Sequence, residues 1–158
     1  MKKFEFTGET KTISLFFRTA TLHRIRAVAE FGLVKVGDLG GWIEKEENLS
    51  HEGKAWVCGD AEVWGNAKVC GDAKIFSVRH VLVIGAIGSR DDFTTFYRDK
   101  DNEITVKCGC FLGKIDKFLE KVTQTHGDSN YALVYRAAVE VARLQIDLSG
   151  EAPKDADE

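Results

Sequence analysis

The chain has 158 residues, of which 44% are hydrophobic and 30% charged, so it is long enough for one domain or two small ones with a buried core. Its 22 Lys and Arg against 25 Asp and Glu give a net charge of −3, which argues against a reader of duplex DNA, because such proteins carry a basic surplus. No apolar run reaches the roughly 18 residues of a membrane span, and residues 1–6 lack the apolar core of a signal peptide. We therefore expect a cytoplasmic protein without a membrane partner.

Between residues 53 and 75, three classes of residue recur with a period of six. The aliphatic, alanine and glycine sets are Val57, Val63, Val69 and Ile75; Ala55, Ala61, Ala67 and Ala73; Gly53, Gly59, Gly65 and Gly71. A six-residue period is typical of a β-solenoid, in which short strands alternate with glycine bends and the aliphatic residue points inward. The repeat predicts a short left-handed parallel β-helix within an N-terminal domain of residues 1–78.

The predicted β-helix is too short to cover its own ends. Three hexads close little more than one coil, so flanking segments or a second subunit must cover the open faces. Trp56 and Trp64 lie within the repeat beside inward-pointing valines, on the predicted outer faces. We therefore expect these two tryptophans to form an interface in a homo-oligomer.

A longer motif surrounds the repeat. It comprises HRIRA at 23–27, VGDLGGWI at 36–43, ENLS at 47–50 and AWV at 55–57, followed by the hexads. Over residues 4–76 the chain resembles a family of bacterial and prophage-encoded hexapeptide-repeat proteins. Its second half resembles a module that follows such repeats in phage genomes, on the segments 88–90, 94–98, 108–111 and 126–128. The resemblance implies a β-helix fold, a phage or prophage origin and residence in the host cytoplasm, and it implies no particular chemistry.

Residues 79–148 predict a small α+β domain that begins with an antiparallel meander. Residues 80–86 form a continuous apolar run, residues 93–98 are β-branched and aromatic, and residues 103–108 alternate apolar with polar. A turn cluster at 99–102 predicts a hairpin between the last two of these strands.

Two amphipathic helices are predicted after the strands, followed by a disordered acidic tail at 149–158. The first helix ends at Gly127, and Asn130 is placed to cap the second. The predicted apolar faces of the two helices are Ile115, Phe118, Leu119 and Val122, and Val134, Ala137, Val141 and Leu144. The predicted fold is therefore mainly β, a short solenoid followed by a meander with a helical hairpin.

The turn after the apolar strand contains candidate ligand-binding residues. Ser89, Arg90 and nearby backbone N–H groups suit an anion, and Thr94, Arg98 and Lys107 join them if their strands are neighbours. The alternative is a strand end with a solvated arginine. Neither a Walker loop nor a G-x-G-x-x-G motif is present, so no nucleotide cofactor is predicted.

Cys108 and Cys110 are candidates for an enzymatic alternative. Two positions apart in a strand, both thiols would project to one face, and His126 could serve as the base of a cysteine-dependent hydrolase. The competing interpretation is a pair of small buried side chains, with His126 at a helix C-terminus. The four cysteines, including Cys58 and Cys70, lack the paired spacing of a zinc site, and no metal is predicted.

The sequence favours a non-enzymatic binding protein whose C-terminal domain holds an anionic, nucleotide-like molecule or a host protein. The phage resemblance implies that this binding protein is a host-interaction or anti-defence factor. Two enzymatic alternatives stay open, the cysteine hydrolase and a degenerate hexapeptide acyltransferase. The acyltransferase needs a histidine at a cleft between solenoids, and His51 is the histidine within the repeat region.

Overall fold

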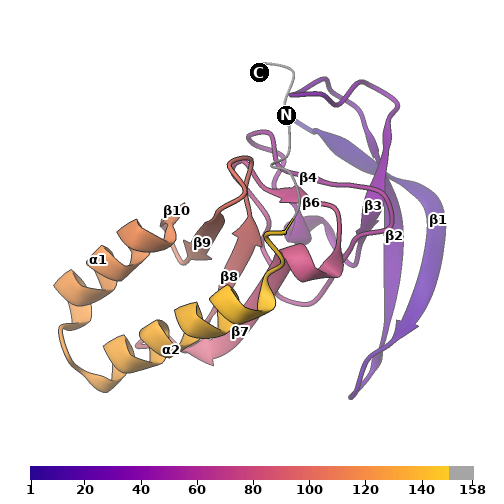
Figure 1. Cartoon of the computed structure of the whole chain (residues 1–158). Coiled ribbons are helices and arrows are strands. Elements are labelled where there is room, and N and C mark those ends of the chain that lie inside the picture. The colour runs from indigo at the N-terminus through magenta and orange to yellow at the C-terminus, as the bar shows by residue number, and fades with distance from the viewer. Residues whose placement is uncertain (150–158) are drawn as a thin grey trace.

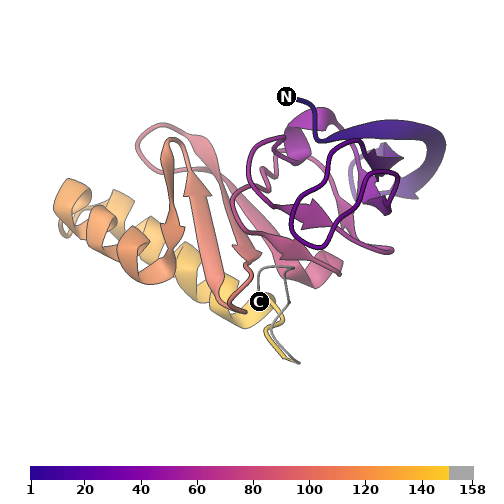
Figure 2. The same ribbon diagram turned by 90° about the horizontal axis from the view of Figure 1, so that it is seen from above.

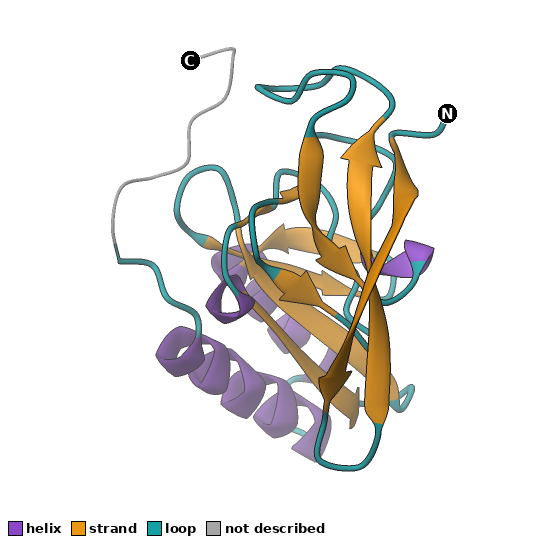
Figure 3. Cartoon of the chain, turned by 90° about the vertical axis from the view of Figure 1, so that its right-hand side faces the viewer, coloured by secondary structure: helices purple, strands orange, loops and turns teal. Residues whose placement is uncertain are grey.

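The computed structural model describes residues 1–149, which form two packed parts (Figures 1 and 2). The N-terminal part contains one four-stranded sheet in the order β1-β2-β3-β5, a two-stranded sheet of β4 and β6, and two short 3-10 helices. Its elements are β1 (Phe4–Ser14), β2 (Thr19–Ala27), β3 (Leu39–Ile43), η1 (Glu46–Asn48), β4 (Trp56–Val57), β5 (Glu62–Val63), β6 (Lys74–Ile75) and η2 (Val78–His80). The long β1–β2 hairpin stands at the border of the molecule away from the α-helices in Figure 1, and it faces the viewer in Figure 3.

The C-terminal part is an antiparallel sheet with a helical hairpin on one face. Its strands lie in the order β10-β9-β8-β7, and every neighbouring pair is antiparallel. The elements are β7 (Val81–Ile87), β8 (Asp92–Arg98), β9 (Ile104–Cys108), β10 (Phe111–Lys114), α1 (Ile115–His126) and α2 (Asn130–Gln145). Neither of these two α-helices, the only ones within residues 1–149, is long and apolar enough to span a bilayer.

The predicted left-handed parallel β-helix is wrong. In the larger N-terminal sheet β1, β2 and β3 pair antiparallel, and parallel pairing occurs between β3 and β5, between β4 and β6, and at an isolated bridge of Leu49 with Val69. The physical reason is the length of the repeat. The hexads supply only one strand pair of their own, β4 with β6, and β5 adds to a sheet built on the β1–β2 hairpin instead.

The period of six does identify which side chains are buried. Its aliphatic and alanine positions are at most 2% exposed and form one core with Phe4, Ile25 and Trp56. Each of its four glycines has a positive φ between 57° and 72°, which places it at a bend. The hexad pattern therefore predicted burial and turns correctly but not the pairing of the strands.

The two parts share the N-terminal core. Tyr97 of β8 is fully buried in it, with Val81 and Val83 of β7 packed against it. The Arg98 Nε donates to the Lys74 carbonyl oxygen at 3.2 Å, across the same junction. The opposite face of the C-terminal sheet packs on α1 and α2 through Phe96 and other residues of a second core. The predicted boundary at residues 78–79 falls within η2.

The C-terminal part differs from the prediction in two local features. A fourth strand, β10, follows a tight turn in which Gly109 has a φ of +59°, so Cys110 lies in a turn and not on the strand of Cys108. Ser129, not Asn130, is the N-cap residue of α2. Of the predicted tail at 149–158, all but Ser149 lies outside the described residues.

The helix α2 packs through a different face from the one predicted. The predicted residues Val134, Ala137, Val141 and Leu144 are exposed. The buried face comprises Ala132, Tyr135, Ala138, Val139 and Ala142. The alanines let the helix axis approach the sheet closely while Tyr135 reaches the second core, so the larger aliphatic side chains are left outside.

Lys3 is buried, and we expect it to make stability depend on pH. Its Nζ donates to the Ala55 carbonyl oxygen at 2.6 Å, and burial, followed by the nearby charge of Lys74, lowers its pKa from 10.5 to about 8. The unfolded chain therefore keeps this proton to higher pH than the folded chain. Stability attributable to Lys3 should rise as pH increases from about 8 to 10.5 and be constant below that window.

The measurement is the urea-unfolding free energy from pH 7 to 10.5 for wild type and for Lys3→Met. The difference between the two proteins isolates Lys3, because other groups that titrate in this range are present in both. Lys2→Met is the matched control, since the Lys2 side chain is 63% exposed. Parallel curves for wild type and Lys3→Met would contradict the lowered pKa.

Candidate functional site

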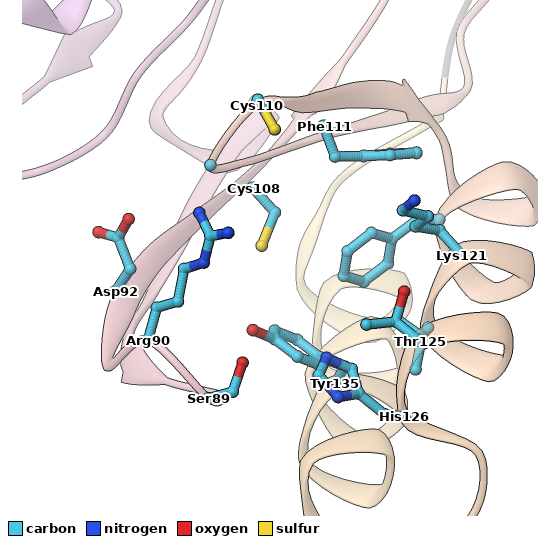
Figure 4. A pocket seen from close by; sticks show the side chains of 13 residues that line it. Ser89, Arg90, Asp92, Cys108, Cys110, Phe111, Lys121, Thr125, His126 and Tyr135 are labelled. Atoms are coloured by element: carbon cyan, nitrogen blue, oxygen red, sulfur yellow. The ribbon is translucent and has the colours of Figure 1, made fainter.

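A pocket of about 220 Å³ lies at the end of the C-terminal sheet, beneath α1 (Figure 4). The wall is supplied by the β7–β8 turn with the start of β8, by the β9–β10 turn with the adjoining strand ends, by α1 from Phe118 to His126, and by Tyr135 of α2. Five sequence-predicted candidates meet here, namely Ser89, Arg90, Cys108, Cys110 and His126. We call it the Arg90–Lys121 pocket after the two cations that line it.

The β7–β8 turn is held against α2 by a close backbone approach. Gly88 has a φ of +80°, and a Cβ at this position would overlap the hydroxyl oxygen of Tyr135. Only glycine allows both the conformation and the approach. Burial, and then the neighbouring Cys108, raise the pKa of Tyr135. Its hydroxyl therefore stays protonated at neutral pH, and it interacts with Cys108 at the wall of the pocket.

The pocket has an excess of positive charge. Arg90 comes from the β7–β8 turn and Lys121 from α1, and both side chains are exposed at the pocket. Among residues 1–149, neither forms an ion pair or a side-chain hydrogen bond. The carboxylate in the wall is Asp92, whose Oδ1 accepts a hydrogen bond from the Phe93 backbone N–H at 2.7 Å. Two cations without partners and one carboxylate favour an anion.

Aromatic rings form the apolar side of the pocket. The Phe118 ring centroid lies 5.5 Å from that of Phe111 and 5.7 Å from that of Tyr135, the latter edge to face. The His126 ring stacks on Tyr135 with an interplanar angle of 28°. A planar group can lie against such a wall while a charged group meets the cations.

The cysteines and His126 share the pocket but do not form a thiol–imidazole pair. The Cys108 Sγ accepts a hydrogen bond from the Thr94 Oγ1 at 3.4 Å, and Cys110 is exposed. The His126 ring contacts Tyr131 and Tyr135. No hydrogen bond within the described chain joins His126 to either thiol, so the geometry lacks the activated nucleophile that a cysteine hydrolase needs.

The remaining predicted ligand-binding residues lie elsewhere. Thr94 is buried behind Cys108. Lys107 pairs with Thr95 in the sheet, so it lies on the opposite face and borders a different cavity between the two parts. Arg98 is 5% exposed, and its guanidinium carbon lies 5.1 Å from the Phe76 ring centroid. These residues do not contribute to the Arg90–Lys121 pocket.

The predicted interface tryptophans are placed differently from each other. Trp56 is 3% exposed and its ring packs edge to face on Phe31 within the N-terminal core. Trp64 is half-buried against a small cluster of Ala20, Leu22 and Trp42. Trp56 is therefore part of the interior and not of the surface.

Sequence reasoning missed Lys121, Thr125 and Tyr135. Lys121 and Thr125 are four residues apart, so they share one flank of α1, and this spacing was a usable signal. Tyr135 was missed because the apolar face of α2 was assigned incorrectly. Among the described residues, no group of three or more His, Cys, Asp or Glu side chains is arranged to hold a metal ion.

No protein-family model matches the chain, and no match is found among curated proteins. The inferred membership in a hexapeptide-repeat family is therefore corrected, because neither the sheet topology nor any family match supports it. The phage origin falls with that resemblance, whereas the anti-defence role stays a prediction that no family match supports. The acyltransferase alternative also falls, since it required a solenoid.

Proposed function

We propose that the protein binds a small anionic molecule carrying a planar ring in the Arg90–Lys121 pocket. The observation that supports this is the convergence of two cations, from separate elements and without ion-pair partners in residues 1–149, on an aromatic wall. An arginine fork suits a phosphate or carboxylate, and lysine adds a point charge.

Each wall residue has a distinct role in this proposal. Arg90 and Lys121 hold the anionic group, and the Ser89 and Tyr135 hydroxyls donate hydrogen bonds to it. Phe111 and Phe118 lie against the ring of the ligand. The volume of about 220 Å³ is below the roughly 300–1,000 Å³ of sites for drug-sized ligands. The ligand is therefore small, of the size of one anionic group and one ring system.

The test is isothermal titration calorimetry with phenyl phosphate, AMP and inorganic phosphate. The aromatic phosphates should bind more tightly than inorganic phosphate, because they also contact the aromatic wall. Arg90→Ala and Lys121→Ala should each weaken binding by about tenfold or more, as expected for loss of a charge-assisted hydrogen bond. Both variants should keep the wild-type melting temperature, since exposed unpaired cations contribute little to stability.

Lys117→Ala is the matched control. Lys117 is a lysine of the same helix, but it pairs with Glu120 at 3.4 Å and does not line the pocket. Equal binding by wild type, Arg90→Ala and Lys121→Ala, or no binding of any of the three probes, would contradict the proposal. A hydrolytic activity lost in folded Cys108→Ser and retained in Arg90→Ala would instead establish the cysteine enzyme.

A further inference from the structure

The strand β7 is an open edge of the C-terminal sheet. It pairs with β8 on one side, and no strand among residues 1–149 pairs with its other side. Its sequence VLVIGAI contains no lysine and no proline, and residues 81–84 remain partly exposed. Proteins commonly protect such edges with charges, prolines or a covering segment. A bulge interrupts the pairing of β7 with β8 between Ile84 and Ile87, and the regular apolar stretch of residues 81–84 before it is suited to pairing with another strand.

The helix α2 leaves an apolar flank beside this edge. Arg136 donates a hydrogen bond to Thr123 of α1 at 3.3 Å, which identifies the side of α2 that faces α1. Val134 lies two residues before Arg136, and Val141 lies two residues before Arg143, which shares the face of Arg136. Both valines therefore lie about 160° around the helix from the side that faces α1. They are 40% and 47% exposed.

This flank lies over the outer side of β7. Contacts between elements place α2 on β7, and α1 on β9 and β10. The side of α2 that faces away from α1 is consequently the side beyond the sheet edge. Figure 1 shows α2 in front of β7 at the lower border of the sheet, with no element beyond them. The strand edge and the Val134–Val141 flank therefore form one continuous surface.

Opposite charges lie at the two ends of β7. Arg79 precedes the strand, and Asp91 lies in the turn that follows it, where its backbone N–H donates to the Gly88 carbonyl oxygen at 3.3 Å. Both are exposed, and neither forms an ion pair within residues 1–149. In an antiparallel two-fold arrangement of two β7 strands, Arg79 of each copy approaches Asp91 of the other. The turn after β7 carries one cation, Arg90, and two carboxylates, Asp91 and Asp92, so its net negative charge is complementary to Arg79 of a second copy.

We propose that two copies of this chain form a symmetric dimer through antiparallel pairing of their β7 strands. The two four-stranded sheets join into one, and the two α2 helices lie side by side on the same face through Val134 and Val141. The surface fits a second copy because a two-fold interface requires one patch to complement itself, in hydrogen bonding, apolar surface and charge. This dimer does not use the predicted tryptophans and does not depend on the proposed ligand.

The test is sedimentation velocity of the full chain at concentrations from about 1 to 100 µM, the range of weak to moderate protein affinities. Wild type should be a dimer. Arg79→Glu and Asp91→Arg should each raise the dimer dissociation constant about tenfold, since each creates two repulsive contacts. The double variant Arg79→Glu/Asp91→Arg should recover the wild-type dissociation constant, because it restores both pairs with reversed signs.

A second pair of variants tests the helix flank. Val141→Lys should abolish the dimer, whereas Val36→Lys should not, because Val36 is 66% exposed in the loop between β2 and β3, outside both α2 and β7. Circular dichroism confirms that each variant is folded. A monomeric wild type at about 100 µM would overturn the proposal. So would a dimer unaffected by Val141→Lys, or a double charge variant that is no tighter than the single ones.

Discussion

Replacement of Val63 by aspartate should prevent the N-terminal part of the chain from folding. Val63 is 1% exposed in the core that β4, β5 and β6 share, so a carboxylate on its side chain would be buried among the aliphatic and alanine side chains of the repeat. Burying such a group costs at least about 4 kcal/mol, against a total stability of about 5–15 kcal/mol for a typical domain. Circular dichroism and urea unfolding measure the loss.

Asn66→Asp is the control for this substitution. Asn66 is exposed and follows Gly65, and the equivalent positions of the other hexads already carry Asp60 and Asp72. The control introduces the same charge at an exposed position where the other hexads already have aspartate, so its free energy of unfolding should equal that of wild type. A folded Val63→Asp protein with wild-type stability would contradict the burial of this side chain.

Replacement of Gly88 by alanine should destabilise the protein and displace Tyr135 from its position in the Arg90–Lys121 pocket. The new methyl group would overlap the Tyr135 hydroxyl, and the φ of +80° disfavours any residue with a Cβ. The backbone contribution is about 1–2 kcal/mol and overpacking adds about 1–3 kcal/mol. Chemical denaturation measures the sum, and weaker binding of phenyl phosphate should accompany it.

Gly109→Ala separates these two contributions. Gly109 has a comparable φ of +59°, but a Cβ there meets no atom within 4 Å, so it reports the backbone cost alone. A double-mutant cycle of Gly88→Ala with Tyr135→Leu tests the clash directly, because the shorter side chain removes the overlapping atoms. Equal destabilisation by Gly88→Ala and Gly109→Ala, with no coupling to Tyr135, would show that the turn does not pack on this ring.

The sequence predicted burial more reliably than pairing. The period of six identified Val57, Val63, Val69 and Ile75 as interior because burial follows from local alternation of side chains with bends. Strand partners follow from long-range contacts, and the β1–β2 hairpin that supplies them lies outside the repeat. The helix α2 has two apolar faces. The alanine face is the one that packs on the sheet, because small side chains let the helix approach closely, and this is a property of the tertiary structure.

The sequence also predicted only some of the residues of the Arg90–Lys121 pocket. Ser89 and Arg90 were found because they follow the end of a strand, and Cys108 was found as a candidate nucleophile with His126 as its base. Lys107 was wrongly predicted to join the site because its face of the strand depends on the register. Cys108 pairs with Thr94 on the pocket side of the sheet, so Lys107 lies on the other side. Lys121 and Tyr135 come from helix faces whose orientation depends on tertiary packing, which the local sequence does not specify.

The position of Tyr97 has a consequence for the folding of the nascent chain. Its side chain completes the N-terminal core, yet it belongs to β8, beyond all of the hexads in the sequence. Ribosomes add about 5–20 residues per second, so the repeat is synthesised seconds before the ring that fills its core. Until β8 emerges, this core has a vacancy of one large aromatic side chain, and the N-terminal part cannot reach its final packing. The two parts of the chain therefore complete their folding together rather than in succession.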